Sequence, residues 1–333
     1  METFSRASLL RRIGGVLFLS SLQPLFADKV RVARVRLADI SRQYAMKMRV
    51  TSDQVVLKGQ HTEVKIEQRG RRAWINGVMF WLHKPSRASA GHWTIEEVDY
   101  LRGLDPVLRS YRSLVGMKPQ RIVIDPGHGG KDTGAIGAGE LYEKTVVLDI
   151  SKRIKAGLEQ FGFKVYLTRT GDQYLTLTER AAFAKKVKAD LFLSIHADGA
   201  TSAAAHGVQT FISTCSGYES SNSNGKGGNL STTLNNTYDR ANAALGYAIQ
   251  SNLLHMSQRS DRGVRRARFS VIKNAPAPAA LIECGFLTNR EEGRLLGSAA
   301  YRKAVAIGIV NGCLLYTSPS PRDRTRSRMP SSA

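Results

Sequence analysis

The stretch Asp125-Pro126-Gly127-His128-Gly129-Gly130 directly follows a short run of β-branched residues, Ile122-Val123-Ile124. A run of this kind is typical of a buried strand. The proline and the glycines that come next disfavour both strand and helix. We therefore predict that a buried strand ends here and that His128 lies in a loop at its carboxyl end.

Two later apolar runs lead into a polar side chain in the same way. Leu191–Ile195 leads into His196, and Ala279–Ile282 leads into Glu283. In open α/β sheets, ligands bind at the carboxyl ends of the strands. Two imidazoles and a carboxylate at the ends of separate strands therefore predict one shared site.

Strand-like and helix-like segments alternate over residues 118–313. The predicted helices span 143–162, 177–187 and 241–255, and further strands span 164–168 and 208–212. This alternation is typical of the α/β class and indicates a mainly parallel sheet that is covered by helices on both faces.

Residues 28–115 have a different pattern of short, alternating strand-like runs, and they predict a small β-rich domain. The pair Asn76-Gly77 between two apolar runs predicts a hairpin. The segment contains no cluster of ionisable residues at ligand spacing, so we expect no catalytic role. The segment also resembles a known domain, the small stalk domain at the N-terminus of copper amine oxidases and several envelope proteins. The matching features are Ile75-Asn76-Gly77-Val78, Leu82 and the segment 94–108. This resemblance implies a spacer or wall contact rather than copper chemistry.

The net charge and the two ends of the chain indicate where the protein works. A formal charge of +22 over 333 residues suggests a polyanionic partner, such as nucleic acid, an acidic membrane surface or the cell wall. Arg11 and Arg12 precede an apolar stretch that ends in Leu25-Phe26-Ala27. This pattern predicts a signal peptide at 1–27, with an uncleaved membrane anchor or a buried helix as the alternatives. We expect export by the Sec or twin-arginine route to the periplasm or cell envelope, with no integral membrane segment after signal removal.

Residues 314–333 are rich in Ser, Pro and Arg, and we interpret them as a disordered, non-native tail.

The polar residues at the strand ends match a known kind of metal site. Two histidines and a carboxylate are the ligand set of a catalytic Zn²⁺ ion, which keeps a fourth position open for water and lowers the pKa of that water to about 7. Glu140 and Glu143 both follow the His128 loop, and we favour Glu143 because it opens the predicted helix. Glu283 is then the group that carries the proton. Each residue alone more often has a structural role, but their conjunction at several strand ends favours a metal site.

Further motifs follow in order along the chain: Glu143-Lys144, Thr168-Arg169, Leu177 with Arg180, Ser194-Ile195-His196-Ala197-Asp198, Gly207-Val208, Asp261-Arg262-Gly263-Val264 and Ile282-Glu283-Cys284-Gly285-Phe286-Leu287-Thr288-Asn289. Together with the His128 loop, they resemble the zinc-dependent N-acetylmuramoyl-L-alanine amidases of the type 3 family over residues 118–311. The resemblance implies that His128, Glu143 and His196 bind Zn²⁺ and that Glu283 is the catalytic acid/base.

The same resemblance implies a fold and a reaction. The fold is an open twisted sheet of about six strands flanked by helices. The reaction is hydrolysis, by a zinc-activated water, of the amide between N-acetylmuramic acid and L-alanine in peptidoglycan, for cell wall remodelling and daughter cell separation. Arg262 and Lys273 lie near Glu283 in sequence and are candidates for binding the carboxylates of the peptide stem.

Other functions remain to be weighed against this one. A zinc peptidase that cuts within the peptide stem has the same ligand set, and a wall-binding module without catalysis needs neither the metal nor Glu283. Export removes nucleic acid as a partner. Some members of the family carry an inhibitory helix near the position of residues 213–237, but this segment is mostly Ser, Gly and Asn without helical periodicity. We expect a mobile loop beside the site, as a gate or as a neutral insertion, and activity without an obligatory activator, although an activator protein is left open.

Overall fold

The computed structural model of the protein describes residues 33–89, 91–109, 119–223 and 230–317. The predicted signal peptide, the junction between the two predicted domains and residues 318–333 of the predicted tail lie outside this part. Residues 314–317 of that tail belong to a helix instead, because Tyr316 is buried in the core. No helix in the described ranges has both the length and the apolar character needed to cross a bilayer.

Six neighbouring strands of an 11-stranded sheet form the centre of the part after residue 119. Their order is β12 (Lys164–Leu167), β9 (Arg121–Pro126), β13 (Leu191–Asp198), β16 (Ala279–Phe286), β14 (Val208–Ser213) and β15 (Asp261–Ala267). Neighbouring strands are parallel except for β16 and β14, which are antiparallel. The prediction of a mainly parallel sheet of about six strands is confirmed.

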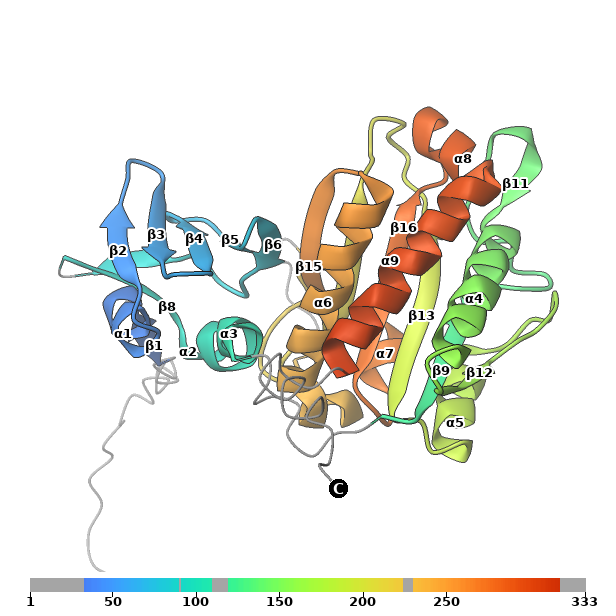
Figure 1. The fold of residues 1–333 in the computed structure, drawn as a ribbon, viewed down its shortest axis with the longest axis horizontal. Helices are drawn as coiled ribbons and strands as arrows, with labels where there is room; N and C mark the ends of the chain where they lie inside the picture. Colours follow the sequence, from blue (N-terminus) through green and yellow to red (C-terminus); the bar gives the residue numbers. More distant parts are fainter. Residues whose placement is uncertain (1–32, 90, 110–118, 224–229, 318–333) are drawn as a thin grey trace, which may run out of the picture. The chain divides into compact units, whose positions relative to one another are not determined.

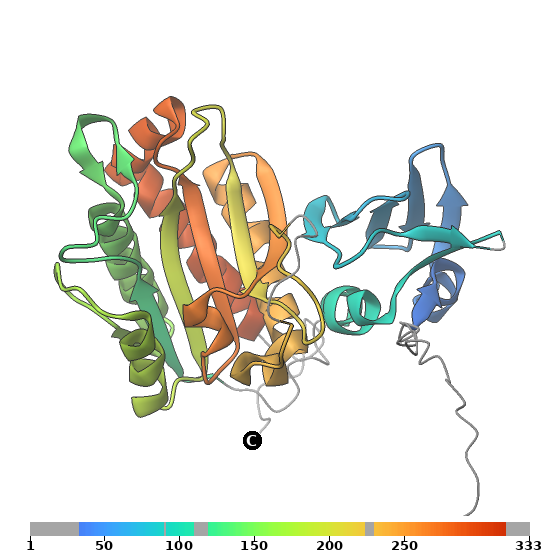
Figure 2. The same cartoon turned by 180° about the vertical axis from the view of Figure 1, so that it is seen from behind.

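Helices cover both faces of this sheet. One face is covered by α4 (Glu143–Glu159), α6 (Asp239–Ser257) and α9 (Ala299–Thr317), which lie in front of the strands in Figure 1. Their apolar residues join those of the strands in one large core. On the opposite face, seen in Figure 2, the shorter helices α5 (Leu177–Lys186) and α7 (Ser270–Lys273) cover only part of the strands. The helix α8 (Arg290–Gly297) follows β16, and the short pieces β10 (Ile136–Gly137), η2 (Ala138–Glu140) and β11 (Leu141–Tyr142) lead into α4.

The part before residue 110 is rich in strands, as predicted. An antiparallel meander consists of β2 (Lys47–Val50), β3 (Gln54–Lys58), β4 (Glu63–Glu67), β5 (Arg72–Ile75) and β6 (Val78–Trp81). A second, three-stranded sheet consists of β1 (Arg34–Arg36), β8 (His92–Glu96) and β7 (Arg87–Ser89). The helical pieces are α1 (Leu37–Gln43), α2 (Glu97–Asp99), η1 (Tyr100–Leu104) and α3 (Asp105–Leu108). The predicted hairpin between β5 and β6 is present, with positive φ at Asn76 and Gly77. One pairing, Phe80 with Val264, places β6 beside β15.

The strands that carry the candidate site run further than their apolar residues suggest. β9 ends at Pro126, so His128 lies in the following loop as predicted. In contrast, β13 and β16 continue past His196 and Glu283, because the ladder between the two strands extends to the pair Asp198 and Phe286. The two polar residues are therefore held inside paired strands rather than after them, which fixes their backbone more firmly.

The expected position of the segment 213–237 beside the site is wrong. β14 is antiparallel to β16, with Gln209 opposite Glu283. The carboxyl end of β14, where the segment begins, is therefore at the opposite edge of the sheet from Glu283. In the described part of the segment, the backbone N–H of Ser221 donates to the carbonyl oxygen of Arg266, and the Ser221 hydroxyl accepts from the backbone N–H of Arg266. A short 3₁₀ helix, η3 (Leu234–Tyr238), precedes α6.

Candidate active site

Three side chains meet at the carboxyl edge of the sheet in the geometry of a metal site. One ligand atom from each of His128, Glu143 and His196 lies within 4.8 Å of the others. Glu143 Oε1 is 3.1 Å from His128 Nε2 and 3.1 Å from His196 Nδ1. Tetrahedral zinc with bonds of about 2.0–2.1 Å requires its ligand atoms to be about 3.3 Å apart. The two nitrogens and the carboxylate therefore match zinc in both donor type and spacing.

The local backbone explains how these three residues come together. His128 adopts a left-handed conformation with φ of 57° in its glycine-rich loop. The neighbouring Gly127 lies so close to the His196 ring that a β-carbon would collide with it. Glu143 is the first residue of α4, and its two carboxylate oxygens accept hydrogen bonds from the backbone amides of Ala135 (2.8 Å) and Ala197 (3.0 Å).

The charges in this cluster favour an ionised carboxylate. Burial alone would raise the pKa of Glu143, but the hydrogen bonds from His128 and His196 outweigh burial and hold that pKa well below its usual value. Burial lowers the pKa of His128, but Glu143 and Asp132 together raise it above its usual value. An anionic, buried oxygen ligand beside two imidazoles is what a divalent cation requires.

Asp132 orients the first histidine. Its Oδ1 is 2.9 Å from His128 Nδ1, which leaves Nε2 directed at Glu143. A carboxylate on the far ring nitrogen fixes the tautomer and increases the basicity of a metal-binding histidine. Asp132 was not identified from the sequence. Its spacing of four residues from His128, within a turn-forming loop, is the only local signal for it.

Two buried arginines stabilise the His128 loop through hydrogen bonds to its carbonyl oxygens. Arg180 donates to the side chain of Asp125 and to the carbonyl oxygens of Pro126 and His128, each at 2.8 Å. Arg169 donates to the carbonyls of Pro126 (3.0 Å) and Gly127 (2.7 Å). Because a buried carbonyl without a partner is costly, these bonds stabilise an otherwise irregular loop.

Glu283 is next to the cluster on the same face of the sheet. It is the direct partner of His196 in the ladder between β13 and β16, so the two side chains point to one side. It is 8% exposed, and its Oε2 atom has no hydrogen-bond partner within the described residues. Burial, together with the carboxylates of Asp198 and Glu143, raises the pKa of Glu283 well above its usual value. Such a carboxyl group can hold a proton near neutral pH.

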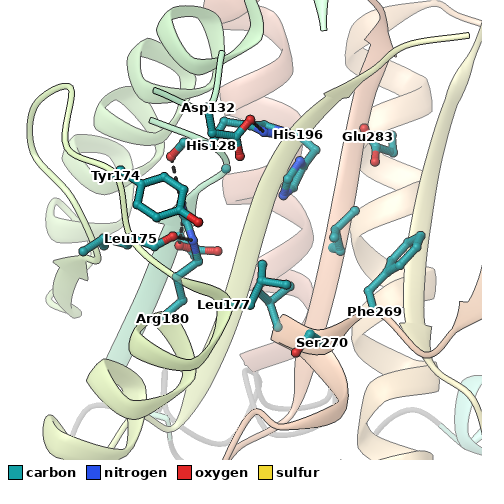
Figure 3. A pocket seen from close by; sticks show the side chains of 14 residues that line it. His128, Asp132, Tyr174, Leu175, Leu177, Arg180, His196, Phe269, Ser270 and Glu283 are labelled. Carbon is teal, nitrogen blue, oxygen red and sulfur yellow. Dashed lines mark hydrogen bonds and ion pairs between the residues drawn. The ribbon is translucent and has the colours of Figure 1, made fainter. Parts of the chain in front are cut away.

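A cavity of about 420 Å³ opens beside these residues. Figure 3 shows His128 and His196 at one end, Glu283 beside them, and Tyr174, Leu177 and Phe269 along the rest of the wall. These three apolar side chains are exposed. The site is thus an open groove with an apolar wall that leads to a polar end.

The remaining sequence-predicted candidates lie in different places. Glu140 is exposed and does not belong to the three-residue cluster. Arg262 donates to the side chain of Gln209 (3.4 Å), the residue opposite Glu283. Lys273 ends α7, which contributes Ser270 and Val271 to the cavity, but it is not one of the described residues that line it.

Known proteins are similar to this chain in sequence. The family model described as N-acetylmuramoyl-L-alanine amidase matches residues 122–314. The N-acetylmuramoyl-L-alanine amidase AmiA of Salmonella typhimurium is 36% identical over 217 residues, and the match covers 59% of this chain and 75% of that protein.

Solved structures agree with the sequence matches. The catalytic domain of CwlV, an N-acetylmuramoyl-L-alanine amidase from Bacillus (Paenibacillus) polymyxa var. colistinus, has a TM-score of 0.51 at 30% identity, over 60% of this chain and 99% of that one. The amidase AmiC2 of Nostoc punctiforme has a TM-score of 0.50 at 34% identity, over 59% and 96% of the two chains. The likeness covers the part of the chain that carries the metal cluster.

Proposed function

This chain belongs to the N-acetylmuramoyl-L-alanine amidase family, and on that premise we propose that His128, Glu143 and His196 hold a catalytic Zn²⁺ ion and that Glu283 is the acid/base. The bond cleaved is the amide between N-acetylmuramic acid and L-alanine in peptidoglycan. The single observation that carries the proposal is the convergence of two imidazole nitrogens on one carboxylate oxygen, each at 3.1 Å.

The protein residues have distinct tasks in this reaction. When bound, zinc supplies a water of lowered pKa and polarises the scissile carbonyl. Glu143 contributes the anionic oxygen that balances the cation, and Asp132 keeps Nε2 of His128 directed at the cation. The amides of Ala135 and Ala197 hold the carboxylate of Glu143 in place.

Glu283 moves the proton. Its carboxylate accepts a proton from the attacking water and then donates it to the nitrogen of the departing alanine. Glu283 lies on the same sheet face as His196 and is its direct partner in the ladder. This position supports the role, because the group that moves the proton has to lie close to both the attacking water and the departing nitrogen. The raised pKa of Glu283 favours the second transfer, in which the carboxyl group acts as an acid.

We place this activity in the cell envelope. The signal-like pattern at 1–27 and the net charge of +22 support an exported enzyme that acts on an acidic polymer. The open groove supports access to a wall strand without an activator. A purified, zinc-loaded protein is therefore expected to cleave isolated peptidoglycan by itself.

Product analysis tests the proposed reaction. Digestion of muropeptides is expected to release intact stem peptides with a free alanine amine and glycan with a free lactyl carboxylate, both identified by mass spectrometry. Chelation with EDTA should abolish this activity and added Zn²⁺ should restore it. New peptide ends within the stem would instead identify a zinc peptidase. Binding of peptidoglycan without any product would identify a wall-binding module.

A further inference from the structure

A row of polar side chains extends from Glu283 across the sheet, away from the metal cluster. Gln209 of β14 is the partner of Glu283 in the ladder, and it is buried. Its Nε2 donates to Asp198 (2.7 Å), and its Oε1 accepts from Arg265 Nη1 (3.1 Å) and from Arg262 Nε (3.4 Å). The buried amide of Gln209 thus connects the acid/base region with two arginines of β15.

The two arginines form no direct ion pair in the part of the chain that the structure describes. Neither Arg262 nor Arg265 forms an ion pair with a carboxylate within the described ranges, whereas Gln209 offers each of them only a neutral oxygen. The Nε atom of Arg265 is buried and has no hydrogen-bond partner there. Burial and the nearby cations Arg262 and Arg71 lower the pKa of Arg265 to about 10, so that its guanidinium remains charged at neutral pH. The nearest carboxylate is Asp198, which interacts electrostatically with both arginines but forms an ion pair with neither, so one carboxylate faces two guanidinium groups. Two partly buried cations beside one anion leave a positive charge that a bound carboxylate would balance.

Aromatic rings hold both guanidinium groups in fixed positions. The guanidinium carbon of Arg265 is 4.8 Å from the centre of the Trp81 ring and 5.9 Å from that of Phe211. The guanidinium carbon of Arg262 is 4.7 Å from the centre of the Phe286 ring. A stacked guanidinium keeps its hydrogen-bond donors in one plane, which suits a planar carboxylate. The arrangement is therefore preorganised for an anion before substrate binds.

The distance from the acid/base residue defines which part of a substrate would reach this row. β15 is two strands away from β16, and strands in a sheet are about 4.7–4.9 Å apart, so the backbone of the arginines is on the order of 10 Å from that of Glu283. Their guanidinium groups reach back to Gln209 on the strand between. An extended peptide spans about 3.3–3.6 Å per residue. The position corresponds to the second or third residue of a peptide that begins at the scissile amide.

We propose that Arg262 and Arg265, held by Gln209, form a subsite for a carboxylate of the second or third residue of the peptide stem. This inference rests on the proposed function and adds a specificity to it. Arg262 was already a candidate from the sequence for binding a stem carboxylate, whereas Arg265 was not identified from the sequence.

The experiment combines a protein change with a matching substrate change. Zinc-loaded full-length protein is assayed on soluble muropeptides whose second or third stem residue carries either a free carboxylate or a carboxamide. Arg265→Gln and Arg262→Gln are expected to raise KM for the carboxylate substrate about 10- to 100-fold, with little change in kcat. For the carboxamide at the responsible position, the same variants should change KM by no more than about 2-fold, because the charge-assisted bond is already absent.

Two controls keep the result interpretable. Lys186→Gln removes the same charge from the exposed end of α5, which leads to the opposite edge of the sheet, and should leave KM unchanged for both substrates. Arg265→Lys should recover part of the affinity for the carboxylate. An equal loss on carboxylate and carboxamide substrates, or no preference of the unaltered protein between them, would overturn the subsite. If the unaltered protein cleaves neither substrate, the proposed function itself fails, which is a separate outcome.

Discussion

Glu283→Gln is expected to retain zinc and to lower kcat by about 10²- to 10⁴-fold, the usual contribution of a positioned general acid/base. Glutamine has nearly the same shape as glutamate but cannot accept or donate the proton. Glu283 is not one of the three clustered ligands, so the bound metal should remain. Zinc content is measured by elemental analysis and kcat on a soluble muropeptide, both on the same protein preparation.

Glu140→Gln is the matched control for this prediction. Glu140 is exposed and precedes α4 by a few residues, so its replacement should change neither zinc content nor kcat. Loss of zinc in Glu283→Gln would show that Glu283 is a ligand. Retention of full turnover would show that another carboxyl group, with Asp198 as the nearest candidate on this face, moves the proton.

Arg180→Met should cost about 3–5 kcal/mol in the free energy of unfolding, because it leaves the carboxylate of Asp125 buried without its cationic partner. The two side chains are 3% and 0% exposed, and their contact distance is 2.8 Å. The variant also removes the hydrogen bonds to the carbonyls of Pro126 and His128. Urea titration of the metal-free proteins measures this change without a contribution from zinc binding.

The comparison for this variant is an ion pair at the surface. Arg153 pairs with Asp149 at 2.8 Å on α4, but both side chains are about one-third exposed. Arg153→Met should therefore cost no more than about 1 kcal/mol. Equal losses in the two variants would mean that burial of the pair of Arg180 and Asp125 adds nothing to stability.

Local sequence patterns were sufficient to predict the edge of the sheet at which the candidate site residues meet. Each of the runs before His128, His196 and Glu283 is short, apolar and followed by a polar residue. In a parallel sheet such runs end at the same edge, so the meeting of these residues follows from the strand directions alone. The structure brings Glu143 rather than Glu140 beside the two histidines, because the first residue of α4 lies at the strand ends; its role as a ligand stays a prediction.

The parts that could not be predicted depend on pairing between distant strands. Nothing local to Val208–Ser213 indicates that β14 is antiparallel to β16, and this reversal moves the segment 213–237 to the far edge. The same reversal brings Gln209 beside Glu283 and, through β15, brings Arg265 into the polar row. Such contacts are decided by the packing of the whole sheet rather than by periodicity within one segment.

The central claim concerns one zinc ion held by three named atoms. Anomalous diffraction at the zinc absorption edge, recorded on crystals of the zinc-loaded protein, tests it directly. We predict one strong peak at about 2.0–2.2 Å from His128 Nε2, His196 Nδ1 and Glu143 Oε1. A peak bound by other residues, or no peak in protein that is active, would contradict the account.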